Sequence, residues 1–363
     1  MRPSNRHTVI IGTGRSIPPK VVPNSDFLAN EFFINYGEPV EAGTNQKVID
    51  KFQQITDIGE RRYADDNVMT SDLATEAGAA ALEDSGIDPE SLDYVVVAHN
   101  FGDVLADNRR SDFVPSLAAR VKHNLAIANP SCIAYDLPFG CPGWVQAMIQ
   151  TDYFLRSGDA SRALIIGAEI LSRVSDPHDR DGMIYSDGAG ATILEARENS
   201  DPIGILAHAA RSDTIDHAKL LWMGESYKPD SEDNRLFLKM FGRKLYSYAL
   251  TNVPGVVKQS LDRAGLDLSD VKKVFLHQAN AKMDEAILNR IFRLYDAGAP
   301  DAAAVMPMSI SWLGNSSVAT VPTLLDLVRK GEMDGHELYP GDIIVFASVG
   351  AGMNINSVVY RWV

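Results

Sequence analysis

The sequence predicts an α/β protein built from two duplicated halves, residues 1–200 and residues 201–363. Three observations predict it: a unit of helix, glycine and strand that occurs twice, a glycine-led helix that occurs twice, and a short apolar strand in each half. With 363 residues, 45% of them hydrophobic and 23% charged, the chain can bury a core of the size that such a fold requires.

The first copy of the repeated unit starts at Thr70, which can cap a helix. Apolar residues then recur at helical spacing, at Leu73, Ala77, Ala80 and Ala81. Gly86 lies just past this pattern, and glycine commonly ends a helix because it adopts the left-handed backbone conformation without strain. The apolar run from Leu92 to Ala98 predicts the strand that follows.

The second copy is a helix that reaches Leu261, a glycine at Gly265, and a strand from Val274 to Leu276. Gly265 lies 179 positions after Gly86. In this register the matched pairs are Leu82 and Leu261, Ile87 and Leu266, Asp88 and Asp267, Leu92 and Val271, and Val95 and Val274. Any α/β protein repeats this order of elements, so these pairs by themselves leave chance similarity open.

A second set of matching segments supports the duplication. A glycine precedes both Cys141 and Asn315, and each of these residues opens an apolar helical pattern. The two helical patterns run from Val145 to Leu155 and from Val318 to Val328, and the apolar strands are Ala163 to Ile166 and Ile343 to Phe346. The chain is therefore predicted to form two α/β halves that share one layered core.

The composition excludes several classes of protein. No run approaches the roughly 18 apolar residues of a membrane span, and the segment from Met1 to Gly14 lacks the apolar core of a signal peptide. We therefore expect a cytoplasmic protein with no membrane span. The formal charge of −14 argues against binding of nucleic acid, because neutralising phosphates requires a basic face.

The chain has two cysteines, Cys132 and Cys141, nine positions apart. This spacing fits neither a metal knuckle nor a disulfide framework, so we predict no metal site. Cys132 is predicted to be a small buried apolar residue, and at least one of the two is expected to be kept for its thiol.

Cys141 lies in the run Asp136-Leu-Pro-Phe-Gly-Cys-Pro-Gly-Trp144, on a sharp turn between a predicted buried strand and a predicted helix. The partial positive charge and free N–H groups of a helix start lower the pKa of a thiol and favour the thiolate. The same N–H groups can receive an oxyanion. Cys141 is therefore a candidate nucleophile, and the alternative is a second buried apolar cysteine.

Two further candidates follow apolar elements of the second half. His277, in Leu-His-Gln-Ala-Asn, comes directly after an apolar strand, where a side chain emerges at the carboxyl edge of a sheet. Asn315, in Trp-Leu-Gly-Asn-Ser-Ser, opens a helix, and its alternative role is to cap that helix. Taken alone, neither residue establishes a site.

The motifs of the chain resemble, nearly from end to end, those of the β-ketoacyl-acyl-carrier-protein synthase III type of thiolase-fold condensing enzyme. The matching segments are Ile10-Ile-Gly-Thr-Gly14, Thr56 to Arg62, the Cys141 turn, Arg162 to Arg173, Tyr185-Ser-Asp-Gly-Ala-Gly190, His277-Gln-Ala-Asn280, Gly314-Asn-Ser-Ser317 and Gly350-Ala-Gly352. The resemblance implies a thiolase-like five-layer α-β-α-β-α fold, which the duplication would independently produce.

The resemblance also implies a reaction and its residues. The Cys141 thiolate would accept an acyl group from a thioester, and His277 and Asn315 would stabilise the enolate formed when a malonyl thioester loses CO₂. The backbone N–H groups of Cys141 and Ala351 would hold the oxyanion, with Gly350 and Gly352 leaving room for the acyl group. Acyl thioesters of an acyl carrier protein or of coenzyme A would be the substrates, and no cofactor is expected.

Two positions depart from the family pattern. Ala351 stands where the family usually has a third glycine, and Ile55 stands where coenzyme-A-binding members carry an arginine before the Thr-Gly-Ile-x-Glu-Arg run. Arg180 matches the other position that stacks near the adenine, so coenzyme A stays possible. A rim for an acidic acyl carrier protein would come from Lys239, Arg243, Lys244 and Lys282.

Extra length near Asn35 to Asn45 and Gly224 to Asn234 favours a specialised member, such as an enzyme that joins two acyl chains into a cyclohexanedione or resorcinol precursor. A fatty-acid-initiating synthase III and a chalcone-synthase-like polyketide enzyme are the alternatives. A noncatalytic subunit that docks a carrier protein would be expected to lack the nucleophile. Family resemblance further implies a homodimer.

Two other enzyme classes fit poorly. A degradative thiolase requires a second cysteine in the C-terminal glycine loop, which here reads Ala347-Ser-Val-Gly-Ala-Gly352. A nicotinamide dehydrogenase would need glycine at the third position of its fingerprint, where this chain has Ile17.

Overall fold

Two β-sheets form the framework of the chain in the computed structural model, which describes all residues except 1–4, 36, 41–43 and 232–233. The larger sheet has the order β1-β11-β10-β6-β9, and the smaller has the order β12-β17-β16-β15. Their strands are β1 (Arg6–Ser16), β6 (Tyr94–His99), β9 (Ile133–Pro138), β10 (Arg162–Ile170), β11 (Asp187–Glu198), β12 (Gly204–Ser212), β15 (Val271–Leu276), β16 (Ile343–Gly350) and β17 (Asn354–Arg361).

The two sheets repeat the same strand relationships. In the larger sheet β10 pairs antiparallel with β11 and parallel with β6, and in the smaller sheet β16 pairs antiparallel with β17 and parallel with β15. All strands of the larger sheet come before residue 200, and all strands of the smaller sheet come after it. Among the residues that the structure describes, no strand of the smaller sheet is a counterpart of β9.

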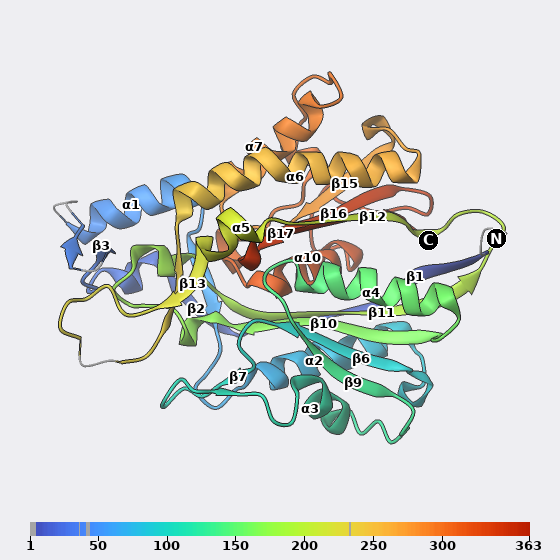
Figure 1. The fold of residues 1–363 in the computed structure, drawn as a ribbon, viewed down its shortest axis with the longest axis horizontal. Helices are drawn as coiled ribbons and strands as arrows, with labels where there is room; N and C mark the ends of the chain where they lie inside the picture. Colours follow the sequence, from blue (N-terminus) through green and yellow to red (C-terminus); the bar gives the residue numbers. More distant parts are fainter. Residues whose placement is uncertain (1–4, 36, 41–43, 232–233) are drawn as a thin grey trace.

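Helices separate and cover the sheets, so that Figure 1 shows five layers. The helices α4 (Gly143–Ser157) and α10 (Thr320–Arg329) lie between the sheets and contact strands of both. The outer faces are covered by α2 (Thr70–Ser85) and α3 (Leu117–Asn124) on one side and by α6 (Gly242–Ala264) and α7 (Ala281–Arg293) on the other.

Shorter elements surround this framework. Figure 1 shows α1 (Asn45–Thr56) at the end of the molecule opposite the two chain termini. The two-stranded sheets are β2 (Lys20–Pro23) with β5 (Glu60–Tyr63), β3 (Phe33–Asn35) with β4 (Glu38–Pro39), β7 (Asp103–Val104) with β8 (Ser111–Asp112), and β13 (Leu221–Gly224) with β14 (Phe237–Met240). The remaining α-helices are α5 (Thr214–His217), α8 (Ala302–Val305) and α9 (Ile310–Leu313).

Both copies of the repeated unit end their helix as the sequence predicts. Gly86 and Gly265 adopt the left-handed conformation, with φ of 65° and 69°, directly after α2 and α6. The start of the first helix differs from the prediction: Thr70 is its first residue, and Met69 is the N-cap. The Asp72 carboxylate accepts a hydrogen bond of 2.8 Å from the Met69 N–H, so an acidic side chain in the first turn stabilises this end.

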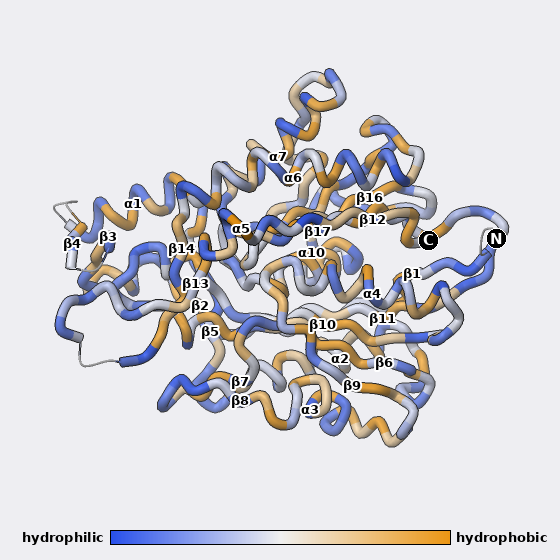
Figure 2. The backbone as a smooth tube through the Cα atoms, viewed as in Figure 1, coloured by the Kyte–Doolittle hydropathy of each residue, from blue (hydrophilic) through white to orange (hydrophobic). Residues whose placement is uncertain are grey.

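The strands that the sequence predicts from their apolar residues lie in the interior of the protein. The segments that it predicts to be surface insertions lie outside this interior. In Figure 2, β6 and β10 are largely orange, whereas the loop between β13 and β14 is largely blue. Cys132 is buried among apolar residues of the layer that contains α2 and β6, as the sequence predicts.

Parts of both predicted insertions, at residues 36, 41–43 and 232–233, lie outside the described residues. Among the helices that are described, none is both long enough and apolar enough to span a bilayer.

Candidate active site

Cys141 lies on the connection from β9 to α4. The Gly140 carbonyl accepts a hydrogen bond of 2.7 Å from the Gly143 N–H, which closes a tight turn around the cysteine before the helix begins. The turn was predicted, but the prediction of a buried strand before it was wrong. β9 is the edge strand of its sheet and only partly buried, because it has a neighbour on one side alone.

The backbone of this turn packs directly against the loop that contains Ala351. A side-chain carbon built on Gly350 would lie 2.6 Å from the Cys141 nitrogen, and one built on Gly140 would lie 2.7 Å from the Ala351 nitrogen. Real side chains do not approach a backbone atom so closely, so glycine is required at both positions. The contact brings the backbone nitrogens of Cys141 and Ala351 close to each other.

His277 follows β15 at the carboxyl edge of the smaller sheet, as predicted. Its backbone N–H donates to the Ala347 carbonyl at 2.9 Å, which fixes the residue to the neighbouring strand β16. The side chain is buried, and Nδ1 has no hydrogen-bond partner among the described residues. Burial lowers the pKa of His277 to about 4, so the imidazole is neutral at neutral pH.

Asn315 is held by one segment of the other half of the chain, around Tyr185. Its N–H donates to the Ile184 carbonyl at 3.0 Å, and its carbonyl accepts from the Ser186 N–H at 2.9 Å. The side-chain oxygen accepts a hydrogen bond of 2.7 Å from the Ser317 N–H. The amide oxygen is therefore used as a cap for the helical turn that follows, and the amide nitrogen is the donor that is left.

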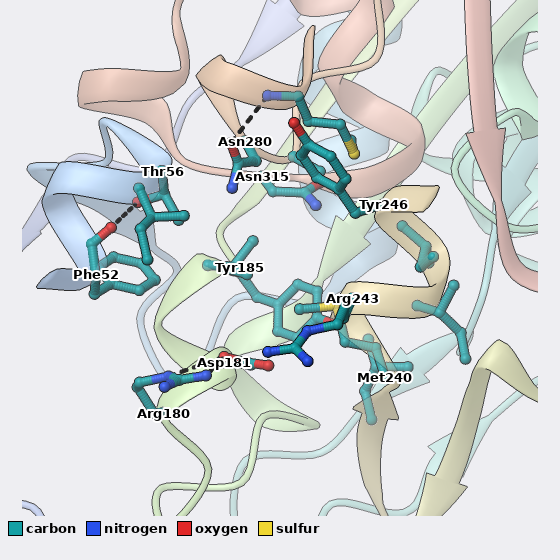
Figure 3. Close-up of a pocket in the computed structure, with 18 of the residues that line it drawn as sticks. Phe52, Thr56, Arg180, Asp181, Tyr185, Met240, Arg243, Tyr246, Asn280 and Asn315 are labelled. Atoms are coloured by element: carbon teal, nitrogen blue, oxygen red, sulfur yellow. Dashed lines mark hydrogen bonds and ion pairs between the residues drawn. The ribbon is translucent and has the colours of Figure 1, made fainter. Parts of the chain in front are cut away.

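A single cavity of about 730 Å³ is lined by Cys141, His277 and Asn315. These residues come from the larger sheet's β9–α4 turn, from the end of β15 and from the segment before α10, so the site is formed where the two halves meet. Figure 3 shows Asn280 and Asn315 on one side of the cavity and Arg180, Asp181 and Arg243 on the other. The wall between them is mainly apolar, and its members include Ile34, Val48, Phe52, Ile55, Leu171, Ile184, Leu221, Leu238, Met240, Leu245 and Met283.

The acidity of the Cys141 thiol differs from the prediction. Burial raises the pKa of Cys141 to about 11, and a hydrogen bond of 3.2 Å from the Ser317 hydroxyl acts in the opposite direction. Burial of the sulfur therefore acts against the lowering that the sequence predicts from the helix start, which lies two residues further along the chain.

The predicted basic rim is only partly present. Arg180 and Arg243 line the cavity, and Arg180 forms an ion pair of 2.8 Å with Asp181. Lys244 and Lys282 are exposed residues that do not line the cavity. Of the two glycines, Gly350 lines the cavity, whereas Gly352 lies just beyond it with φ of 76°.

The assignment of Lys239 to the rim was wrong. The Lys239 side chain is 1% exposed, and its Nζ lies 2.5 Å from Asp176 and 3.4 Å from Asp179. The same nitrogen lies over the Tyr227 ring, 3.4 Å from its centroid. Lys239 therefore fastens β14 to the segment that precedes Arg180.

Three residues near Cys141 were not predicted: Ser317, Asn100 and Glu169. Ser317 belongs to the Gly-Asn-Ser-Ser motif, and Asn100 and Glu169 lie at the carboxyl ends of the adjacent parallel strands β6 and β10. That location is a signal that the sequence contains, since side chains at this edge commonly face a site.

Within the described parts of the chain, no group of three or more His, Cys, Asp or Glu side chains could hold a metal ion.

Comparison with known proteins identifies the family. A model of 3-oxoacyl-[acyl-carrier-protein (ACP)] synthase III matches residues 135–214, and a model of the C-terminal part of the same enzymes matches residues 261–362. The chain is similar to the β-ketoacyl-[acyl-carrier-protein] synthase III of Erythrobacter litoralis, with 33% identity over 97% of this chain and 98% of that protein.

Solved structures agree with this result. The crystal structure of 3-oxoacyl-(acyl carrier protein) synthase III from Pseudomonas aeruginosa PAO1 matches with a TM-score of 0.78 and 27% identity, covering 98% of each chain. Xanthomonas campestris OleA shares the fold with a TM-score of 0.77 at 18% identity, covering 100% of each chain. The thiolase-like α/β fold is thus confirmed. The chain belongs to the 3-oxoacyl-[acyl-carrier-protein] synthase III family of condensing enzymes.

Proposed function

We propose that Cys141 is the nucleophile of a two-step Claisen condensation. In the first step its sulfur forms a bond to the carbonyl carbon of an acyl thioester, and the carrier thiol leaves with the proton that Cys141 loses. In the second step a malonyl-type thioester loses CO₂, and the resulting carbanion attacks the acyl carbonyl and releases Cys141. The observation that carries this proposal is that Cys141, His277 and Asn315, from distant parts of the chain, line one cavity.

His277 and Asn315 suit the stabilisation of an enolate. The imidazole is neutral because burial lowers its pKa to about 4, and a neutral imidazole has one N–H to donate. The Asn315 amide oxygen is occupied by the Ser317 N–H, which leaves the amide N–H₂ as the donor. Two uncharged donors can stabilise the oxygen of a thioester as negative charge develops on it.

The N–H groups of Cys141 and Ala351 are the proposed oxyanion site for the acyl carbonyl. The close approach at Gly140 and Gly350 supports this role, because it leaves no side chain between the two backbone segments. Each donor of this kind typically changes the rate by a factor of about 10² to 10³.

Acyl thioesters of an acyl carrier protein or of coenzyme A are the proposed substrates, and the reaction requires no cofactor. Arg180 and Arg243 at the cavity supply positive charge for the phosphate-bearing arm of either carrier, and the exposed Lys244 and Lys282 extend that charge outward. Ile55 also lines the cavity, at the position where coenzyme-A-binding relatives are expected to have an arginine, and Lys47 and Lys51 of the same helix supply positive charge to this wall.

An acyl-transfer experiment tests the first step. The protein is incubated with a panel of acyl thioesters carried by acyl carrier protein or by coenzyme A, and its intact mass is measured. The proposal predicts an added acyl group that peptide mapping places on Cys141. A noncatalytic docking subunit would bind the carrier and gain no mass. Faster acylation from one carrier identifies the preferred donor.

A second candidate is an enzyme of the same chemistry that joins two acyl chains. The apolar wall of the cavity is formed largely by α1 and by β13 and β14, next to the two segments of extra length. A wall of this kind suits a second aliphatic chain beside the first. Mass analysis of the products from acyl and β-ketoacyl thioesters would show a product that contains both chains, and a fatty-acid-initiating enzyme would instead extend one chain by two carbons.

We also propose a homodimer in which β9 strands of two copies pair. β9 is an edge strand, and Ile133 at its start is 51% exposed. An unpaired edge of this length offers backbone hydrogen bonds to another strand. Sedimentation should give twice the mass of the chain at micromolar concentration, and a monomer would contradict the proposal.

A further inference from the structure

A continuous chain of hydrogen bonds leads from the interior to the sulfur of Cys141. The Ser317 hydroxyl donates to Cys141 Sγ at 3.2 Å, and Asn100 Nδ2 donates to Ser317 Oγ at 3.2 Å. The Asn100 N–H donates to Glu169 Oε1 at 2.6 Å, and Asn100 Nδ2 donates to the same oxygen. None of these three residues is part of the Cys-His-Asn set.

From Asn100 to the sulfur, the donors of these hydrogen bonds all act in one direction, and Asn100 also donates to Glu169 on its other side. Serine has one hydroxyl hydrogen, and its oxygen accepts from Asn100, so the hydrogen is free to point at the sulfur. A hydrogen bond donated to sulfur stabilises the thiolate relative to the thiol. The contact from Ser317 accordingly acts to lower the pKa of Cys141, against the effect of burial.

Ser317 is held in an unusual backbone conformation. Its φ is +53°, in the left-handed region that residues other than glycine seldom occupy. Its N–H donates to Asn315 Oδ1 at 2.7 Å while its hydroxyl contacts Cys141. One residue therefore orients two members of the proposed catalytic set, and strain of this kind is commonly concentrated at functional sites.

Glu169 is the buried residue at the far end of this series of hydrogen bonds. It is 1% exposed, and no ion pair with it is found in the part of the chain that the structure describes. Burial raises the pKa of Glu169 to about 8, so the carboxyl group is mostly protonated at neutral pH. Behind a thiolate, a neutral carboxyl group holds Asn100 by hydrogen bonds without adding a repelling negative charge.

We propose that the Ser317 hydroxyl stabilises the Cys141 thiolate, and that Asn100 and Glu169 are positioning residues that hold this hydroxyl in place. The inference rests on the proposed role of Cys141 as nucleophile and explains how a sulfur in a desolvated cavity becomes reactive. The plain structural alternative is that the same bonds only tie the ends of β6 and β10 to the segment before α10.

Alkylation of Cys141 separates these alternatives without any acyl substrate. The rate of modification by iodoacetamide is followed by intact mass between neutral and alkaline pH, with peptide mapping to exclude Cys132. Ser317→Ala should slow the reaction about three- to tenfold at each pH below the thiol pKa, because the thiolate fraction falls while the intrinsic reactivity of each thiolate rises slightly. Asn100→Ala should shift the profile in the same direction by less.

One matched control and one conservative variant of a positioning residue accompany these tests. Ser316→Ala removes the neighbouring hydroxyl, which lies 3.4 Å from Thr320 Oγ1 and does not contact Cys141, and should leave the profile unchanged. Glu169→Gln keeps an uncharged oxygen that can accept from Asn100, and should retain the profile of the unmodified chain at neutral pH. Thermal unfolding is measured for every variant, and if Ser317→Ala does not fold, Ser317→Gly, which also removes the hydroxyl and suits the left-handed backbone at this position, takes its place.

The outcomes are distinct. The inference is overturned if folded Ser317→Ala and Asn100→Ala proteins are alkylated at the rate of the unmodified chain at every pH. It is supported if both are slower and Ser316→Ala is not. Failure of the proposed function would look different: no acyl group would appear on Cys141 from any thioester, whatever the alkylation profiles show.

Discussion

A side-chain carbon added to Gly140 would lie 2.7 Å from the backbone nitrogen of Ala351, a residue 211 positions further along the chain. The reciprocal approach, from Gly350 to the Cys141 nitrogen, is 2.6 Å. Two backbone segments from opposite halves therefore meet without side chains between them. The arrangement brings the backbone nitrogens of Cys141 and Ala351 close together, as the proposed oxyanion site requires.

Gly350→Ala should prevent this approach. Since Gly350 has an extended backbone, with φ of −168°, the effect is steric, and acylation of Cys141 should slow by about 10²-fold or more as the oxyanion donors are displaced. Intact-mass measurement of acyl-enzyme formation checks this. Gly255→Ala, in α6 with no atom within 4 Å of the added carbon, is the control and should acylate normally. Equal rates for the two variants would remove the oxyanion assignment.

The pH dependence of decarboxylation should reflect a neutral His277. Because burial lowers its pKa to about 4, the imidazole is uncharged from about pH 5 upward, and its N–H donor is present throughout. The rate of CO₂ release from a malonyl thioester should therefore show no loss as pH rises through 6.5. Activity that falls around pH 6.5 would mean that the imidazolium is the active form.

The same shift has a consequence for stability. Between about pH 6.5 and pH 4 the unfolded chain takes up a proton on His277 that the folded protein does not, so the free energy of unfolding should fall as pH falls through this window. His277→Gln removes this contribution and should show a flatter dependence in urea unfolding. Parallel curves for the two proteins would contradict the assigned pKa.

Asn315→Asp should separate the two chemical steps. The aspartate still offers an oxygen to the Ser317 N–H, so the helical turn after it is preserved. Its second oxygen replaces the amide donor with negative charge at the place where an enolate would form, and condensation should fall by about 10²-fold or more. Acylation of Cys141, measured by mass in the same preparation, should change by less than about tenfold. If acylation and condensation slowed by the same factor, Asn315 would act already in the acylation step.

Lys239→Met should destabilise the protein, because Asp176 and Asp179 lose the cation between them. Breaking a buried pair in this way costs about 3 to 5 kcal/mol. Lys244→Met, at an exposed position, should change the free energy of unfolding by about 0.5 kcal/mol or less. Urea unfolding of both variants decides whether Lys239 is structural, and better retention of stability by Lys239→Met than by Lys244→Met would contradict the buried network.

The sequence predicts the features that depend on neighbouring residues. The helix ends at Gly86 and Gly265 were predictable because a left-handed residue is a local requirement. His277 was placed at a sheet edge because it directly follows an apolar strand. The family motifs then connected Cys141, His277 and Asn315, which local patterns alone could not place in one cavity.

Features that depend on distant partners were missed or misread. Lys239 was taken for a surface cation because its buried partner Asp176 lies 63 positions away in the sequence. The thiol of Cys141 was expected to be acidic because the burial that raises its pKa does not show in a local pattern. Ser317 was within a recognised motif, but its contact with Cys141 joins residues 176 positions apart.

The most direct test of the account is the formation of a carbon–carbon bond by the intact protein and by Cys141→Ala. An acyl thioester is supplied with a malonyl thioester labelled at the carbon that attacks, and the products are analysed by mass. The unmodified protein should give a β-ketoacyl product that contains the acyl chain and the labelled carbon, and Cys141→Ala should give none. Labelled product at an undiminished rate from Cys141→Ala would contradict the account.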